Sequence, residues 1–301
     1  MKSIDKVIKT ACKLIDLPYN KFNLDNYLSV LKSHKINFNF SQTKNNLPIK
    51  LMSGNDEHSG IVETGLFQSR SKRNIYIVGK GILFDSGGLD LKPPDGTMQA
   101  MTDDKAGAII ALIVANYLQG NVIAYCPCTT NLIQTSKITP GDIIKIGKHL
   151  VKITNTDAEG RLILAQAISS INQKSNDIII SIATLTGGCS IAVGDRATAI
   201  MSDNNDLLKK YAEAAFEAKE LAWALPMFDY MQKYYTKEPI RNHIKEFKGS
   251  TCQGGMFIKQ FVKYPKNFIH LDIASSAFDD VGMANGVPIK SLINFIRKLN
   301  D

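Results

Sequence analysis

The sequence predicts an α/β fold, with a mostly parallel, mixed sheet flanked by helices on both faces. Strand-like and helix-like segments alternate from residue 75 to the end of the chain, which is typical of this fold class. Several strand-like segments are continuously apolar, such as Asp177–Ala183 (DIIISIA), as in strands buried on both faces. Because no Gly-, Pro- or Ser-rich linker divides residues 70–300, we expect one domain.

The N-terminal part is expected to hold two helices, a short strand and a loop or exposed hairpin, at 1–17, 24–34, 35–40 and 54–72. The first helix is expected to end at Leu17, because the residue before a proline disfavours the helical conformation. Alternating Ile36, Phe38 and Phe40 have the period of a strand. The last segment is polar and contains glycine, which favours a loop.

The alternation that follows predicts five strands and five helices from hydrophobic periodicity. The strands are expected at 75–78, 121–126, 150–154, 177–183 and 268–273. The helices are expected at 106–118, 162–172, 207–222, 254–262 and 292–299. In such sheets, functional sites gather at the carboxyl ends of the strands. Lys80 and Asp157 follow predicted strands directly, so both are expected at that edge.

Composition narrows the class of protein. The 301 residues are 44% hydrophobic and 21% charged, as in globular proteins. The N-terminus lacks the apolar core of a signal peptide, and the apolar helix at 106–118 is too short to span a membrane. The five cysteines are scattered, which indicates reduced thiols and a cytoplasmic protein. A formal charge of +8 fits either a nucleic-acid surface or a lysine-rich proteome, and the lysines form no dense basic block.

The heptapeptide Asn155–Arg161 (NTDAEGR) places a charged residue at every second position. If the heptapeptide is extended, Asp157, Glu159 and Arg161 point to the same side. Two carboxylates so close repel each other unless cations neutralise them. The heptapeptide therefore predicts a metal ion beside the carboxylates and an anion beside the arginine.

Two further segments carry charged residues near turns. Gly79–Lys92 (GKGILFDSGGLDLK) places Lys80 and Asp85 around a glycine-rich turn, and Met98–Gly107 places an acidic residue at a helix start. Each has a simpler explanation when taken alone. Asp104 is compatible with a helix N-cap, and Lys80 with a solvated surface residue. The glycines lack the GxGxxG spacing of a dinucleotide site.

Together these segments resemble the leucyl aminopeptidase family of two-metal exopeptidases (peptidase family M17, cytosol aminopeptidase). The resemblance rests on NTDAEGR at 155–161, on GKG-x-x-FDSGG followed by Lys92, on ATLTG at 183–187 and on HLDIA at 270–274. It spans nearly the whole chain. It implies a zinc-exopeptidase-like α/β/α sandwich and the release of hydrophobic, leucine-like N-terminal residues from peptides.

The resemblance also implies the site residues. Asp85, Asp157 and Glu159 would bind one divalent metal, and Lys80, Asp85, Asp104 and Glu159 the other. Zn²⁺ and Mn²⁺ are the expected ions, with Mg²⁺ and Co²⁺ as alternatives. A metal-bridging hydroxide would attack the scissile carbonyl, Lys92 would stabilise the oxyanion, and Arg161 would hold a bicarbonate that moves protons. The substrate pocket would be formed by Met101, Thr184, Leu185, Gly187 and Ala274.

Several features depart from the family pattern. The family's N-terminal domain appears absent, and residues 1–20 resemble the helix that joins it to the catalytic domain, so 1–301 is expected to be a single catalytic domain. The family's hexamer depends partly on the absent domain, which leaves the state of the expected homo-oligomer open. The metal ligand is Asp104 or, in the other register, Asp103, and Asp104 fits better. Lys105 replaces an apolar residue beside that ligand, which predicts altered metal affinity or activity.

Two other functions compete with the enzyme. Some members of the family also bind DNA, which agrees with the positive charge. A structural or assembly protein on an inactive peptidase fold is the second alternative. A complete set of charged residues argues against an inactive protein, because the set serves no purpose without chemistry. Its members are Lys80, Asp85, Lys92, Asp157, Glu159 and Arg161.

Overall fold

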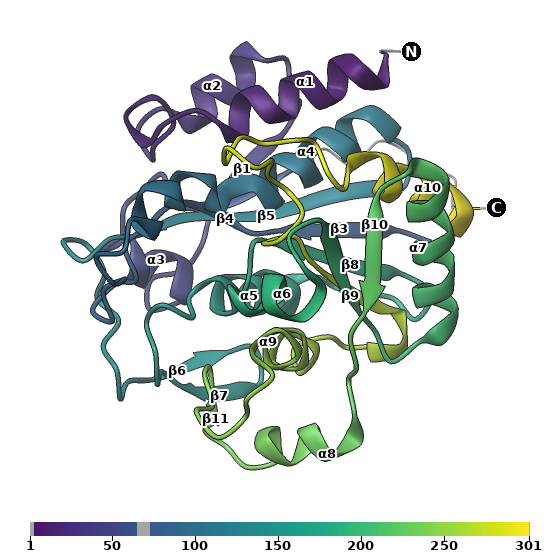
Figure 1. Cartoon of the computed structure of the whole chain (residues 1–301). Coiled ribbons are helices and arrows are strands. Elements are labelled where there is room, and N and C mark those ends of the chain that lie inside the picture. The colour runs from purple at the N-terminus through teal and green to yellow at the C-terminus, as the bar shows by residue number, and fades with distance from the viewer. Residues whose placement is uncertain (1–2, 65–72, 301) are drawn as a thin grey trace.

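A central sheet of nine strands organises the chain. The computed structural model describes residues 3–64 and 73–300. The strands of this sheet are β1 (Asn39–Gln42), β2 (Gly60–Glu63), β3 (Ile75–Gly79), β4 (Gly81–Asp85), β5 (Val122–Asn131), β8 (Ile178–Ala183), β9 (Ala197–Met201), β10 (Leu221–Ala224) and β12 (Phe268–Asp272). Their order is β1-β2-β5-β3-β8-β12-β9-β10, with β4 paired to β5 off this path (Figure 1).

The centre of the sheet is parallel, and the strands on either side of it join it in the antiparallel direction. β5, β3, β8 and β12 run parallel to one another, and β4 is parallel to β5. β2 is antiparallel to β5, and β9 is antiparallel to β12. Every residue of β8 is buried, as expected for a central strand covered on both faces. The predicted mixed, mostly parallel sheet is confirmed.

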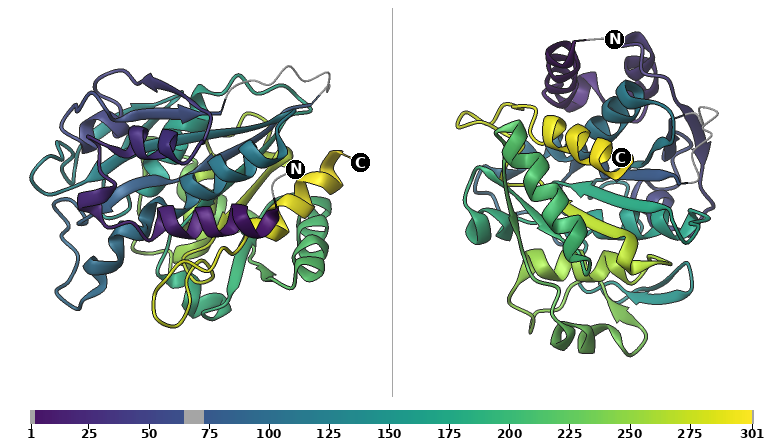
Figure 2. Two further views of the ribbon diagram at one scale, coloured as in Figure 1. Left: turned by 90° about the horizontal axis from the view of Figure 1, so that it is seen from above. Right: turned by 90° about the vertical axis from the view of Figure 1, so that its right-hand side faces the viewer.

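Helices cover both faces of the sheet. One face carries α1 (Ile4–Ile15), α4 (Ala106–Leu118), α7 (Asn205–Ala218) and α10 (Ile289–Asn300), which share one hydrophobic core. The other face carries α3 (Pro48–Met52), α5 (Gly160–Ser170) and α9 (Ser250–Lys259), which share the second core. The views in Figure 2 show α1 and α10 on the same side as α4. The remaining helices are α2 (Tyr27–Ser33), α6 (Gly188–Val193) and α8 (Asp229–Gln232).

A second, small sheet lies below the α5 and α9 layer in Figure 1. It consists of β6 (Ile143–Ile146), β7 (His149–Lys152) and β11 (Ile240–Arg241), in the order β11-β7-β6. The strand predicted at 150–154 is therefore part of this sheet, and its expected place in the parallel sheet is wrong. Exposed residues alternate along β6 and β7, a pattern that a sheet with one solvated face produces.

Two further expectations need correction. The segment at 54–72 was expected to be a loop or exposed hairpin, but it contains the buried strand β2, which pairs with β5. Residues 65–72 lie outside the described residues. The helix expected at 207–222 ends at Ala218, because Lys219 adopts the left-handed conformation (φ 57°), and Leu221 begins β10. Within the described chain, no helix has the length and apolarity needed to cross a membrane.

Glycines bring the start of α4 against the sheet. A Cβ atom on Gly107 would lie 2.3 Å from the carbonyl oxygen of Ile182, and one on Gly79 would lie 2.4 Å from the Gly107 carbonyl. The backbone of Lys80 donates to Ile182 O at 3.0 Å and accepts from Ala108 N at 2.8 Å. This packing places the 3₁₀ segment η2 (Thr97–Lys105), which precedes α4, beside Lys80.

Lys105 joins η2 to the N-terminal helix. Its side chain is fully buried, and its ammonium donates to the carbonyls of Ile15, Leu17 and Thr102 at 2.7, 2.9 and 2.5 Å. The ammonium also lies 5.4 Å from the centre of the Phe22 ring. The cation therefore binds the C-terminal end of α1, where helix carbonyls need donors.

We expect Lys105→Met to lower the free energy of unfolding by about 2–4 kcal/mol, because three carbonyls lose their buried donor at roughly 1 kcal/mol or more each. Urea unfolding followed by circular dichroism measures the change. Lys50→Met is the matched control, since Lys50 is also buried but its ammonium reaches one carbonyl, that of Asp56. Equal losses in the two variants would contradict the assignment.

Candidate functional site

A cavity of about 650 Å³ opens at the carboxyl ends of the central strands. Lys80 follows β3, Asp85 ends β4, and Thr184 follows β8. All twelve residues predicted for the site line this cavity: Lys80, Asp85, Lys92, Met101, Asp104, Asp157, Glu159, Arg161, Thr184, Leu185, Gly187 and Ala274. They come from segments separated by nearly two hundred residues, so the fold brings together everything that the motifs indicated.

Each of two lysines in the cavity lies between two carboxylates. Lys80 Nζ lies 2.6 Å from Asp104 Oδ2 and 2.8 Å from Glu159 Oε1. Lys92 Nζ lies 2.8 Å from Asp85 Oδ2 and 2.5 Å from Asp157 Oδ1. With all six groups ionised, the formal charge of the group is −2. Such an excess of negative charge in a mostly buried site calls for further cations.

The geometry and chemistry of these side chains fit divalent metals. Asp85, Asp157 and Glu159 each offer an oxygen atom, and these atoms all lie within 4.8 Å of one another. Asp104 Oδ2 is buried and makes no hydrogen bond, although it is paired with Lys80. A donor set of carboxylates with one amine suits hard and borderline dications. These residues could therefore hold the metals that the sequence predicts.

Burial and mutual repulsion shift the pKa values of the carboxyls. Burial, together with Glu159, raises the pKa of Asp85 to about 6. Burial also raises the pKa of Asp104 to about 8, against the opposing effect of Lys80. For Glu159, burial acts upward, but Lys80 and Lys92 lower its pKa below the ordinary value. The electrostatic strain among the acids is thus greatest at Asp104, and cations nearby would relieve it.

The heptapeptide is a turn followed by a helix, so the extended form on which the shared direction of its three charged side chains depended is not adopted. Glu159 is already helical (φ −78°, ψ −39°), and Arg161 lies in the first turn of α5. A helix start turns successive side chains in different directions. Asp157 and Glu159 still converge, while Arg161 makes no ion pair with either of them in the described part of the chain.

Arg161 is held by neutral acceptors. Its Nη1 donates to the carbonyl of Asn242 at 2.8 Å and to Gln253 Oε1 at 3.1 Å. Its Nε is buried and has no hydrogen-bond partner among the described residues. Burial lowers the pKa of Arg161, but a guanidinium stays charged at neutral pH. A buried cation with a free donor, lining the cavity, could bind an anion.

The structure separates the two candidate aspartates at the start of α4. Asp104 is 5% exposed, contacts Lys80, and accepts from Thr184 Oγ1 at 2.7 Å. Asp103 also lines the cavity, but its Oδ1 accepts from Thr102 Oγ1 at 3.3 Å, and within the described residues it makes no ion pair with Lys80. In this geometry Asp104, and not Asp103, contacts the lysine of the carboxylate group. Lys105 points to α1 instead of the carboxylates, which explains how a cation is tolerated beside Asp104.

Several supporting residues were not found from the sequence. Asn131 Nδ2 donates to Asp85 Oδ1 at 2.8 Å and to Thr156 O at 3.1 Å. Asp272 accepts from Leu185 N and from Thr186 Oγ1, at 3.1 and 2.7 Å. Asp272 lies within the HLDIA motif, so that motif was a signal for it. Asn131 belongs to no motif, and its role depends on the pairing of β4 with β5.

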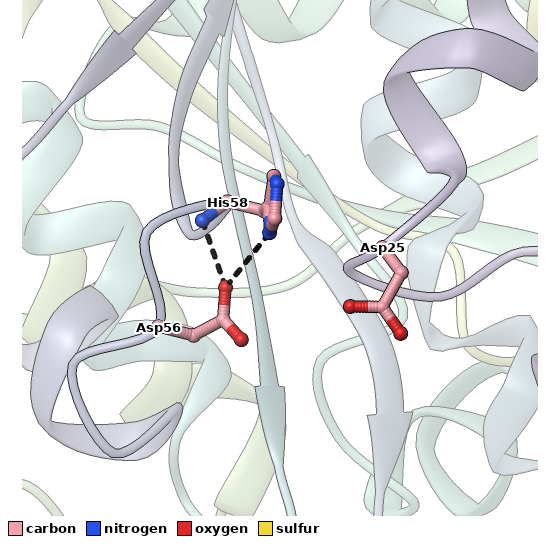
Figure 3. Close-up of side chains that lie close together, drawn as sticks. All are labelled: Asp25, Asp56 and His58. Atoms are coloured by element: carbon pink, nitrogen blue, oxygen red, sulfur yellow. Dashed lines mark hydrogen bonds and ion pairs between the residues drawn. The ribbon is translucent and has the colours of Figure 1, made fainter.

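A second group of possible ligands lies outside the cavity. Asp25, Asp56 and His58 offer atoms within 4.8 Å of one another. Figure 3 shows His58 turned to Asp56, with the Asp25 carboxylate facing the pair from another segment. Asp56 Oδ1 accepts from His58 N at 2.8 Å and lies 3.3 Å from His58 Nδ1. An Asx turn and an ion pair account for this contact, and nothing else at this partly exposed position indicates a cation.

We expect Gly160→Ala to disturb the site more than the fold. A Cβ atom at Gly160 would lie 2.6–2.8 Å from Cε, Cδ and Nζ of Lys80. A long side chain can shift at modest cost in stability, but here its amine would leave Glu159 and Asp104. We expect Mn²⁺ affinity to fall about tenfold or more, with a smaller change in melting temperature. Binding titrations with Mn²⁺ and thermal unfolding measure the two effects, and an unchanged affinity would contradict the expectation.

Comparison with known proteins shows the family to which the chain belongs. The model of the cytosol aminopeptidase family catalytic domain matches residues 40–293. The probable cytosol aminopeptidase of Protochlamydia amoebophila is 34% identical over 250 residues, or 77% of this chain and 49% of the relative. That of Streptomyces coelicolor is 36% identical over 231 residues, or 74% and 44%. This chain spans about half the length of the curated relatives it matches.

The same fold occurs in a solved structure, the bottromycin maturation enzyme BotP in complex with Mn. Its TM-score is 0.84 at 24% sequence identity, and the match covers 98% of this chain and 70% of that chain. Family model, relatives and fold agree with the motifs and with the cavity they line. The chain belongs to the cytosol aminopeptidase family.

Proposed function

We propose that this protein is a two-metal aminopeptidase that hydrolyses the N-terminal peptide bond of peptides. The observation that carries the proposal is the group of four carboxylates and two lysines, with a formal charge of −2, inside a 650 Å³ cavity. Membership in the family supports the reaction class.

In this proposal, Asp85, Asp157 and Glu159 hold one dication. Asp85, Asp104 and Glu159 hold the other together with Lys80, which would bind as a neutral amine after losing its proton to the incoming ion's surroundings. The ions would be Zn²⁺ or Mn²⁺, with Mg²⁺ and Co²⁺ as alternatives, because such donor sets suit all four. When bound, the two ions would supply Lewis-acid activation of a water and of the scissile carbonyl.

The chain's own cations would serve the reaction at two points. Lys92 reaches the carboxylates Asp85 and Asp157 from outside the proposed ligand set. From there its ammonium can stabilise the negative charge that develops on the carbonyl oxygen. Arg161, with its unpartnered Nε, would hold a bicarbonate ion that accepts and returns a proton. Asn242 and Gln253 leave Arg161 oriented for that anion.

The rest of the cavity would bind the N-terminal residue of the substrate. Met101, Thr184, Leu185, Gly187 and Ala274 line it. Asp272 orders the backbone at Leu185. Apolar walls around a few polar groups are typical of small-ligand pockets, which supports a preference for leucine-like side chains.

Residues 1–301 are proposed to form a single catalytic domain, to work in the cytoplasm and to form a homo-oligomer. Of the two alternatives, a DNA-binding protein has only the charge of +8 in its favour. An inactive scaffold leaves the buried charged cavity without a purpose. Neither has a structural observation of its own.

We expect hydrolysis of leucine-p-nitroanilide that a chelator abolishes and that added Mn²⁺ or Zn²⁺ restores. The reason is that removing the ions leaves the carboxylates paired only with the two lysines. Release of p-nitroaniline, followed by its absorbance, measures the rate. Protein without metal-restorable activity toward leucine, alanine and arginine derivatives would contradict the proposal. Activity restored only on the last two would correct the substrate preference.

A further inference from the structure

Asn242 binds the heptapeptide from outside it. The residue follows β11 and is completely buried. Its Oδ1 accepts from Thr154 N at 2.8 Å and from Asn155 N at 3.3 Å. Its Nδ2 donates to Asn155 O at 2.7 Å and to Ala158 O at 3.3 Å. One amide group thus fixes the backbone on both sides of Asp157.

The chemistry at this position is specific for an amide. Both donors and acceptors of the heptapeptide backbone face the same side chain, and of the short side chains only asparagine offers a carbonyl and an NH₂ group together. Aspartate has the same shape but would place a second acceptor against two carbonyls. The turn has few hydrogen bonds of its own: Ala158 N donates to Asn155 O at 3.3 Å, and Asp157 N donates to Asn155 Oδ1 at 2.7 Å.

The backbone of Asn242 fixes a third functional residue. Its carbonyl accepts from Arg161 Nη1 at 2.8 Å. Its amide donates to Lys152 O at 3.1 Å, which continues the pairing of β11 with β7. The small sheet thereby provides the frame against which Asp157, Glu159 and Arg161 are placed.

We infer that Asn242 is a positioning residue, which sets the heptapeptide turn so that Asp157 and Glu159 converge on the metals. The inference rests on the proposed function, because it assigns those carboxylates to metal ions. Outer-shell partners of this kind typically contribute 10–100-fold to metal affinity or activity. Asn242 does not line the cavity, so its effect passes through the turn.

The test compares Asn242→Ala with Asn116→Ala. Asn116 is a matched control, since its side chain also bonds backbone groups, those of Asn37 and Leu112, at 2.9–3.1 Å. Two readouts are needed: Mn²⁺ affinity of the folded protein by equilibrium dialysis, and amide hydrogen exchange of the metal-free protein. We expect Asn242→Ala to weaken Mn²⁺ binding at least about tenfold and to speed exchange at Thr154 and Asn155.

Asn116→Ala should leave both readouts at the wild-type level even where it lowers the melting temperature. Wild-type Mn²⁺ affinity in Asn242→Ala, or an equal loss in Asn116→Ala, would overturn the inference. If Asn242→Ala does not fold, the same two measurements on Asn242→Asp test the inference. Aspartate keeps the acceptor for Thr154 N and Asn155 N, so hydrogen exchange at these amides should stay slow while Mn²⁺ affinity falls. Unchanged Mn²⁺ affinity in Asn242→Asp would overturn the inference.

Failure of the proposed function has a different signature. Wild-type protein that binds no Mn²⁺ would refute the metal site itself. The exchange measurement would still report whether Asn242 orders the turn, because it is made without metal. If the wild-type protein binds Mn²⁺ and Asn242→Ala binds it more weakly, the result supports both the proposed metal site and the positioning role of Asn242.

Discussion

Glu159→Gln should abolish hydrolysis of leucine-p-nitroanilide and strongly weaken binding of divalent metals. Glu159 is 2% exposed, and its Oε1 lies 2.8 Å from Lys80 Nζ. Glu159, Asp85 and Asp157 each offer a carboxylate oxygen, and these oxygens lie within 4.8 Å of one another. Glutamine has the same shape, but it removes one negative charge from a proposed bridging position. The loss of several kcal/mol of metal-dependent stabilisation corresponds to a fall of about 10³-fold or more in rate.

Initial rates and Mn²⁺ titrations measure both effects of Glu159→Gln. Glu217→Gln is the matched control, because Glu217 is also paired with a lysine, Lys298 at 2.8 Å, but lies exposed on α7. That control should keep wild-type rates. A Glu159→Gln protein that retains more than about a tenth of the activity would contradict the proposed bridging role.

Lys92→Ala should retain the metals and lose most of its turnover. Although burial opposes it, Asp85 and Glu159 raise the pKa of Lys92 above its ordinary value, so the side chain is a cation. Its removal takes no ligand from the proposed set and lowers the positive charge beside the carboxylates, which should not weaken metal binding. The lost oxyanion stabilisation should reduce kcat by about 10²–10³-fold, with KM little changed.

Steady-state kinetics and metal analysis of the purified variant test the Lys92 prediction. Lys259→Ala is the control, since Lys259 is ion-paired with Asp203 at 2.9 Å and its side chain is 13% exposed against 12% for Lys92. It should behave as wild type. If Lys92→Ala instead lost its metals, Lys92 would have to be assigned to the metal site.

Much of the site could be predicted, because most of its charged residues lie in short sequence motifs. The residues from Lys80 to Lys92 and from Asn155 to Arg161 carry the acids, amines and guanidinium at fixed spacing. The structure places six of these charged residues on the same cavity: Lys80, Asp85, Lys92, Asp157, Glu159 and Arg161. Their individual roles stay predictions until the variants are measured.

The supporting residues could not be predicted, because nothing local marks them. Asn131 reaches Asp85 only because β4 pairs with β5. Asn242 reaches Asn155 across 87 positions, through the pairing of β11 with β7. A single asparagine forms no pattern in the sequence that would indicate its role. Most of its partners here are backbone atoms, which every residue has whatever its side chain.

The sequence by itself determined the class of fold, the family and the kind of chemistry, because hydrophobic period and residue type are local properties. Only the tertiary structure decided that the heptapeptide turns into α5 instead of extending, that β7 belongs to a separate sheet, and that Asp104 contacts Lys80. These outcomes depend on long-range pairing and on glycine contacts such as Gly107 against Ile182. The competing local conformations of a short segment differ little in free energy, so packing against the rest of the chain selects between them.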